Sequence, residues 1–392
     1  MPEKAASRAR KIVNEGDILY STVRPYLHNM CIINREFSRE AIASTGFAVL
    51  KCCADYSNEF LFYYMMSPDF DSYANDTANS KGVAYPAIND ERLSMALVPI
   101  PPVSEQRRIL KQLLEILPTI QMYDITHQRL EKLNDTFPAQ LKKSILQDAV
   151  QGKLVLQDPA DEPASALLER IRAEKEQLIK EGKIKRDKHE SVIFRRDNSY
   201  YEKVDEIERC IDDELPFEIP ESWGWCRLKS LTENITSGSR DWAKYYSTTG
   251  AAFLRMGNLS KNSFDLRLEH IQRVTIPSKA EGTRTSLQSG DLLFSITGDV
   301  GMLGLIPDGF EKAYINQHTA MIRFLPEMRN KYIPYLLLTD YAQKFYNANQ
   351  HGIKNSFRLD SIGELLVSIP PEKELFRILQ RISLVLSKIA VL

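Results

Sequence analysis

The sequence predicts a mixed α+β protein that contains two copies of one kind of domain, separated by long helical arms. Two observations predict this class. A set of sequence blocks occurs twice in the same order, and each set ends in paired prolines followed by a helix-like apolar period. The 392 residues, 43% of them apolar, are enough to bury two or three separate cores.

Each copy of the repeat begins with a Gly-Asp pair before a short apolar strand. The strands read GDILYS at 16–21 in the first half and GDLLFS at 290–295 in the second. A stretch rich in Tyr and Leu follows in both halves, then a glycine, another strand, and the proline pairs at 101–102 and 370–371. We expect each half to fold as a compact domain of strands and helices, and this pseudo-symmetry suits a ligand with two parts.

After the first proline pair, apolar residues recur every seven positions in two registers that lie four apart. Such a seam predicts a helix that pairs with another helix, and Pro118 and Pro138 should kink or break it. The polar seam residues His127 and Asn134 can fix the register of pairing, or belong to a solvated patch near Pro138. The seam consists of Ile109, Ile116, Tyr123, Leu130 and Phe137 in one register and Leu113, Ile120, His127, Asn134 and Leu141 in the other.

The segment between the first arm and the second domain is interpreted as a linker with one short helix, which Pro163 can begin and Gly182 can end. The basic run at 180–196 has few apolar neighbours, so we interpret it as solvated, with phosphate contact as the alternative. The predicted parts are a first domain at 1–102, an arm at 103–150, the linker at 151–214, a second domain at 215–371 and the start of a second arm at 372–392. About 59 residues that precede the Gly-Asp pair in the second domain have no counterpart in the first domain. The chain is therefore expected to begin within the first domain and to end within the second arm.

Composition and motifs exclude several classes. The net charge of -1 means that any surface for nucleic acid must be local, and five cysteines without a C-x-x-C pair argue against zinc sites and disulfide frameworks. Without an apolar leader or a stretch of roughly 18 apolar residues, a cytoplasmic protein that does not enter the membrane is expected. No Walker A loop is present, and GDVGMLG at 298–304 is interpreted as a turn between strands. We therefore expect no catalytic residue, no metal site and no bound cofactor.

The strongest binding chemistry lies in the run ITSGSRDWAKYYSTTGAAFLRMGNLS of the second domain. Basic, hydroxyl and amide side chains among aromatic residues can reach phosphates and base edges, although the aromatics could equally form core and the charges ordinary surface. The candidate DNA-binding residues are Ser237, Ser239, Arg240, Lys244, Tyr245, Arg255 and Asn258 in this run, Gln317 and His318 in a second polar cluster, and Arg24 and Lys81 in the first domain.

Taken together, the ordered blocks resemble type I restriction-modification specificity subunits. The resemblance is carried by GDILYSTVRPYLHN, PIPPVSEQRRIL, LKKSILQDAVQGKL, ASALLERIRAEKEQLIKEGKIKR and ELPFEIPESWGWCRL. It implies two target recognition domains, the first incomplete, that each read half of a split site in double-stranded DNA and are held apart by paired spacer helices. It also places TSGSR and RMGNL in the DNA-facing part of the second domain.

The resemblance further implies a non-catalytic subunit of an adenine-N6 methyltransferase complex. Modification subunits would bring S-adenosylmethionine and the methylation chemistry, and a restriction subunit would bring the motor and nuclease. The incomplete first domain should expose strands and apolar surface, which favours self-association. Two alternatives are a standalone DNA-modifying enzyme, which needs a cofactor loop, and a structural coiled-coil protein, which does not explain two repeated domains.

Overall fold

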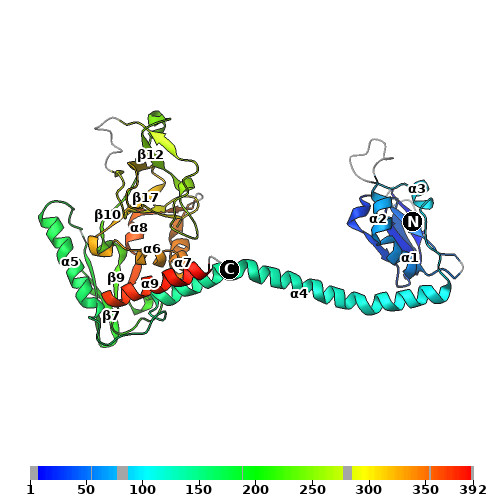
Figure 1. Cartoon of the computed structure of the whole chain (residues 1–392), viewed down its shortest axis with the longest axis horizontal. Coiled ribbons are helices and arrows are strands. Elements are labelled where there is room, and N and C mark those ends of the chain that lie inside the picture. Colours follow the sequence, from blue (N-terminus) through cyan, green and yellow to red (C-terminus); the bar gives the residue numbers. More distant parts are fainter. Residues whose placement is uncertain are drawn as a thin grey trace. The chain divides into compact units, whose positions relative to one another are not determined.

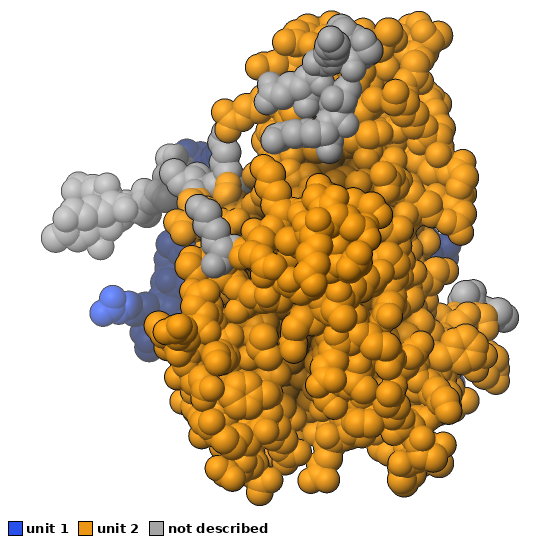
Figure 2. All heavy atoms as spheres, turned by 90° about the vertical axis from the view of Figure 1, so that its left-hand side faces the viewer, with its two compact units in different colours: residues 1–132 blue, residues 133–392 orange. Residues whose placement is uncertain are grey.

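The structure, a computed structural model, describes residues 8–53, 55–76, 87–187, 189–276, 285–352 and 355–389. The chain divides into two compact units, Met1–Lys132 and Leu133–Leu392, which Figure 1 shows as ribbons and Figure 2 colours separately. Each unit contains both helices and sheets, so the predicted α+β class is confirmed. Within the described ranges, no helix combines the length and apolar character that crossing a bilayer would need.

Unit 1 (Met1–Lys132) contains a small antiparallel sheet with short helices packed against it. The strand β2 lies between β3 and β5, and β1 pairs with β4. The core includes Tyr20, Met65 and Phe70. The elements are β1 (Ala9–Val13), β2 (Ile18–Ser21), β3 (Met30–Ile32), β4 (Ala41–Ser44), β5 (Phe47–Leu50), α1 (Asn58–Met65), α2 (Pro68–Asn75) and α3 (Asp90–Ser94).

The arm is one continuous helix, α4 (Val103–Val150), over the residues predicted for it. Pro118 and Pro138 do not interrupt α4, so the expectation of a break is wrong. A proline removes one backbone hydrogen bond, and a helix of 48 residues keeps its many other bonds on both sides. The predicted seam is largely open to solvent, with Tyr123 68% and Leu130 55% exposed.

Unit 2 (Leu133–Leu392) contains two four-stranded sheets. One has the order β10-β17-β14-β15 and is antiparallel, and the other has the order β11-β13-β12-β16, in which β12 and β16 run parallel. Their strands are β10 (Thr232–Ser237), β11 (Tyr246–Ser247), β12 (Ala251–Leu254), β13 (Gln272–Val274), β14 (Leu292–Ser295), β15 (Leu303–Leu305), β16 (Ala313–Ile315) and β17 (Thr319–Phe324).

Short helices and two strand pairs complete unit 2, and its largest core joins the end of α4 with α9 through Leu146, Val150, Ile378 and Ile382. The GDVGMLG run forms the turn between β14 and β15, as predicted. The remaining elements are β9 (Gly224–Arg227), α6 (Tyr332–Leu336), α7 (Asp340–Asn349), β18 (Gln350–His351), β19 (Ser356–Phe357), α8 (Leu359–Gly363), β20 (Leu366–Ile369) and α9 (Glu372–Ile389).

The segment predicted as a linker is folded, which corrects that interpretation. Besides α5 (Ala164–Lys180), it forms an antiparallel sheet of β6 (Ser191–Arg196), β7 (Ser199–Val204) and β8 (Ile207–Cys210). The basic run is partly neutralised there, because Arg186 pairs with Glu176 at 2.6 Å and Arg196 with Glu208 at 3.1 Å. The charge of the segment therefore led to the wrong prediction, because its basic residues form ion pairs within the folded segment itself.

The sequence repeat is also a structural repeat. Gly16 and Gly290 both adopt a positive φ, of 87° and 81°, which glycine adopts without steric cost. The following carboxylates, Asp17 and Asp291, each accept a backbone N–H three residues upstream at 2.8 Å. The strand order β3-β2-β5 of unit 1 matches β15-β14-β17 of unit 2. The Gly-Asp turn thus starts the same three-stranded frame twice.

Candidate functional site

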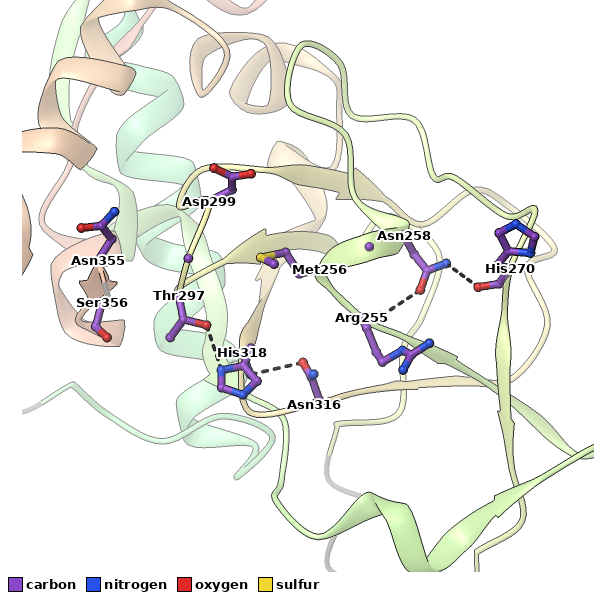
Figure 3. A pocket seen from close by; sticks show the side chains of 12 residues that line it. Arg255, Met256, Asn258, His270, Thr297, Asp299, Asn316, His318, Asn355 and Ser356 are labelled. Atoms are coloured by element: carbon purple, nitrogen blue, oxygen red, sulfur yellow. Dashed lines mark hydrogen bonds between the residues drawn. The ribbon is translucent and has the colours of Figure 1, made fainter. Parts of the chain in front are cut away.

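Unit 2 contains a cavity of about 1200 Å³ that collects polar side chains from several loops. Figure 3 shows these side chains projecting from loops that are far apart in the sequence. The lining residues are Arg255, Met256, Gly257, Asn258, His270, Thr297, Gly298, Asp299, Asn316, His318, Asn355 and Ser356.

The sheet topology explains why these loops meet. Strands β12 and β16 are parallel neighbours, so the loops that follow their carboxyl ends emerge at the same edge. Strand β14 is antiparallel to β17, and Ser295 at the end of β14 lies opposite Thr319 at the start of β17. The loop after β14 therefore lies beside the loop that joins β16 to β17. Residues 255–258, 297–299 and 316–318 come together by this arrangement.

Asn258 supports the loop that presents Arg255. Its side chain is buried, its Oδ1 accepts the Arg255 backbone N–H at 3.0 Å, and its Nδ2 donates to the carbonyl of Arg267 at 2.9 Å. A buried amide satisfied by the backbone fixes loop shape. Asn258 thus lies in the predicted place, but its hydrogen bonds within the protein suit it to positioning Arg255 rather than to contacting a ligand.

His318 and Asn316 form the opposite wall of the cavity. The His318 Nδ1 lies 2.8 Å from the Thr297 Oγ1, which joins two loops, and the Asn316 Oδ1 accepts the His318 backbone N–H at 3.2 Å. The Gln317 Nε2 lies 2.9 Å from the His318 Nε2. His318 therefore lines the cavity, and Gln317 adjoins it through this contact.

The TSGSR loop lies directly behind this wall. Ser239 forms a parallel bridge with Asn316, and the backbone at Gly238 passes so close that an added Cβ would lie 2.1 Å from the Ile315 carbonyl oxygen. Ser239 is buried and its Oγ has no hydrogen-bond partner among the residues that the structure describes, whereas Ser237 is half-buried at the end of β10. These serines adjoin the cavity but do not line it.

The remaining predicted residues lie elsewhere. Arg240 and Lys244 are exposed, and the Lys244 ammonium lies 5.1 Å from the Tyr245 ring centroid. Tyr245 packs against buried Trp242, so the core interpretation holds for these aromatics. Arg24 precedes a short 3-10 helix in unit 1 with φ 53°. Lys81 lies outside the described residues.

Sequence reasoning missed His270, Thr297, Asp299, Asn355 and Ser356. Most of them belong to short loops outside the clusters that the sequence singled out, whereas Ser356 begins β19, and the available signal was their position next to strands. Across the described residues, no group of three His, Cys, Asp or Glu side chains is arranged to hold a metal ion. The site offers hydrogen-bond donors and acceptors of both charges.

Comparison with known proteins shows which proteins this chain resembles. Residues 5–135 match the family model described as type I restriction modification DNA specificity domain. The chain is 31% identical over 289 residues to the type I restriction enzyme EcoAI specificity subunit of Escherichia coli, which covers 62% of this chain and 45% of that protein. The chain is therefore similar to the type I specificity subunits.

A second relative of these specificity subunits is the EcoEI specificity subunit of Escherichia coli, 30% identical over 241 residues, which are 59% of this chain and 37% of that protein. The chain thus spans less than half the length of either relative. A solved HsdS subunit from Thermoanaerobacter tengcongensis shares the fold, with a TM-score of 0.54 and 21% identity over 100% of this chain and 78% of that one.

Proposed function

We propose that this chain reads duplex DNA through the cavity-bearing edge of unit 2, which would recognise one half of a split target. The observation that carries the proposal is the convergence of charged, amide and hydroxyl side chains from separate loops on one cavity. Such a set offers donors and acceptors for base edges and phosphates, which a core or a simple structural surface does not need.

The chemistry of the wall residues suits base reading. Arg255 can donate two hydrogen bonds to guanine or contact a phosphate, Asn355 can pair with adenine, and Asp299 can accept from the cytosine amino group. Asp299 also repels phosphate, so the cavity suits base edges better than the backbone of DNA. The exposed Arg240 and Lys244 outside the cavity are better placed to contact phosphates.

The same proposal includes partner subunits. The relatives are named as specificity subunits of type I restriction enzymes. We infer that modification subunits dock on this chain and carry S-adenosylmethionine and adenine-N6 methyl transfer, with a restriction subunit joining for cleavage. The purified chain alone should incorporate no methyl groups into DNA, and co-expression with a modification subunit should produce methylation. Methyl transfer by the chain alone would contradict this.

DNA reading is tested with the complex of the chain and its modification subunit, on duplexes selected from a random pool. Arg255→Ala should reduce the preference for the selected duplex over the pool, since a good base contact contributes about 1–3 kcal/mol of discrimination. Lys244→Ala should weaken binding to the selected duplex and to the pool equally. It should also reduce the slope of log affinity against log salt concentration by about one unit. The control is Lys203→Ala, an exposed cation on β7. Unchanged binding in both test variants would contradict the proposed interface.

A further inference from the structure

Residues 97–100 of unit 1 repeat the strand β20 of unit 2, but their surroundings differ. The sequences LVPI at 97–100 and LVSI at 366–369 both run into a proline pair. Strand β20 pairs with β9 and is buried along its whole length. In unit 1, Leu97 is 89% and Ile100 80% exposed. Residues 97–100 therefore have the sequence of a buried strand, but no neighbouring strand in the described part of unit 1 covers them.

In unit 2, two tyrosines hold the side of β20 that faces away from β9. The Tyr341 hydroxyl donates to the Leu366 carbonyl at 2.9 Å, and the Tyr332 hydroxyl donates to the Ser368 carbonyl at 2.8 Å. Backbone groups of successive strand residues point to opposite edges. The carbonyl and N–H of Val367 are therefore the groups that face β9.

Unit 1 holds residues 97–100 in the same way, although its tyrosines come from other positions. The Tyr64 hydroxyl donates to the Leu97 carbonyl at 2.8 Å, and the Tyr56 hydroxyl donates to the Pro99 carbonyl at 2.9 Å. The backbone of Val98 then faces outward, as that of Val367 does. Within the described part of unit 1, no strand pairs with this edge.

The proline in LVPI is compatible with strand pairing. The Leu228 N–H donates to the Leu365 carbonyl at 2.9 Å, which marks a hydrogen-bonded pair of the ladder. Bonded and non-bonded pairs alternate in an antiparallel ladder, so Val367 is a bonded position and Ser368 is not. Pro99 replaces Ser368, where an incoming strand needs no N–H.

A carboxylate beside the open edge matches the partner of a tryptophan in unit 2. The Trp223 Nε1 donates to the buried Glu374 Oε2 at 3.1 Å, just before β9. Glu374 is the third residue after Pro371, and Glu105 is the third residue after Pro102. Glu105 is half-buried, and its Oε2 lies 3.9 Å from Arg108 one turn along α4. Glu105 can therefore accept an incoming indole N–H.

We propose that residues 97–100 are an acceptor edge for a β-strand from another polypeptide, with the chemistry of β9 and its preceding Trp. The strand would pair antiparallel with Val98 in a bonded position, cover Leu97 and Ile100, and place an indole N–H on Glu105. Strand addition of this kind uses backbone hydrogen bonds for affinity and side-chain contacts for specificity. The chain's own β9 is already engaged, since Trp225 is 1% and Cys226 6% exposed in unit 2.

The test uses the full chain and fluorescent peptides of its residues 215–231, measured by anisotropy. The unmodified peptide should bind saturably. N-methylation of the Cys226 amide removes the N–H of a bonded position and should weaken binding at least about tenfold, the effect of losing a buried backbone bond. The matched control is N-methylation of the Trp225 amide, a non-bonded position, which should leave binding within about twofold.

Protein variants locate the binding edge. Glu105→Ala should weaken the unmodified peptide about tenfold and should not affect a peptide with Trp223→Phe, which has no indole N–H. Glu115→Ala, an exposed carboxylate nearly three turns further along α4, is the control and should bind as the wild type does. The proposal is overturned if the unmodified peptide does not bind, if the two methylations weaken binding equally, or if Glu105→Ala binds the unmodified peptide as the wild type does.

Discussion

The two units build the same turn but hold its carboxylate differently. In unit 1, Asp17 faces Lys51 at 3.6 Å, and the Lys51 side chain is 57% exposed. In unit 2, the Asp291 side chain is 1% exposed and accepts two hydrogen bonds from Arg323, each of 2.7 Å. Both aspartates are buried, so the repeat keeps the backbone frame, while the exposure of the basic partner, 57% for Lys51 and 18% for Arg323, decides how strongly each copy depends on its charge.

The units also differ in what surrounds the shared frame. In unit 2, β10 extends the sheet beside β17, β9 covers β20, and the sheets present the loops of the cavity. In the described part of unit 1, the frame β3-β2-β5 has no further strand. The comparison suggests that the frame supplies stability and that recognition depends on the strands and loops added to it.

The largest difference should appear when the turn carboxylates are neutralised. Asp291→Asn keeps an acceptor for the turn but leaves the half-buried Arg323 without a counter-charge, which costs about 3–5 kcal/mol of unfolding free energy. Asp17→Asn should cost less than about 1 kcal/mol, because its partner is solvated. Urea denaturation measures both, with the exposed Glu269→Gln as control. Equal losses for the two aspartates would contradict the role of burial.

A second difference concerns acid stability, which should depend on the sheet β6-β7-β8 of unit 2. Hydrogen bonds from Arg227, opposed by burial and helped by Ser191 and Arg209, lower the pKa of Glu202 from 4.5 to about 2. The lowered pKa stabilises the fold above pH 4.5, and this contribution is lost as the pH falls toward about 2.

Glu202→Gln should therefore cost about 3 kcal/mol at pH 7 and remove most of the pH dependence between about 4.5 and 2. Unfolding free energies measured across this range check the prediction. Glu206→Gln, an exposed carboxylate in the same sheet's turn, is the matched control and should behave as the wild type does. A variant that still loses stability across this range would assign the acid sensitivity to another group.

Two glycines sharpen the comparison at a smaller scale. A Cβ at Gly238 would lie 2.1 Å from the Ile315 carbonyl oxygen behind the cavity, whereas a Cβ at Gly46 in unit 1 meets only the Ser44 Oγ at 3.9 Å. Gly238→Ala should cost about 1–3 kcal/mol and weaken DNA binding, because backbone must move. Gly46→Ala should stay within about 0.5 kcal/mol. Thermal melting and DNA binding distinguish them, and a neutral Gly238→Ala would show that the TSGSR loop does not support the site.

The smallest effect is expected in α4, between the two frames. His127→Leu combined with Asn134→Leu should raise the melting temperature slightly in a complex in which the seam pairs with another helix, because both replace polar seam residues with apolar ones. Melting of the assembled complex is the measurement, and Lys111→Ala on α4 is the control. A lower melting temperature would place these residues off the seam.

Sequence patterns predicted those parts of the fold that depend on interactions between residues close together in the sequence. The Gly-Asp turns and the long helix follow from glycine geometry and from a seven-residue period. The sheet β6-β7-β8 was missed because the positive charges of this segment indicated a solvent-exposed linker. The acidic partners of these charges, Glu176, Glu202 and Glu208, come next to them only in the folded structure. The prolines of α4 were given too much weight, since the helix tolerates each single lost hydrogen bond.

The site was predicted in part for the same reason. Arg255 and His318 were identified from residue type, and both line the cavity. Asn258 was identified by type too, but its buried amide serves the loop. Thr297 and Asn355 could not be found, because parallel and antiparallel pairing brings distant loops to one edge, and one sequence does not reveal which strands are neighbours.

The central claim is that DNA is read at the cavity of unit 2, and photo-crosslinking tests it most directly. Selected duplexes carrying photoreactive bases would be crosslinked to the complex of this chain with its modification subunit, and the attached peptides identified by mass spectrometry. The account predicts crosslinks within 255–258, 297–299 and 316–318, and their loss when unmodified duplex competes. Base crosslinks confined to unit 1 or to the sheet β6-β7-β8 would contradict it.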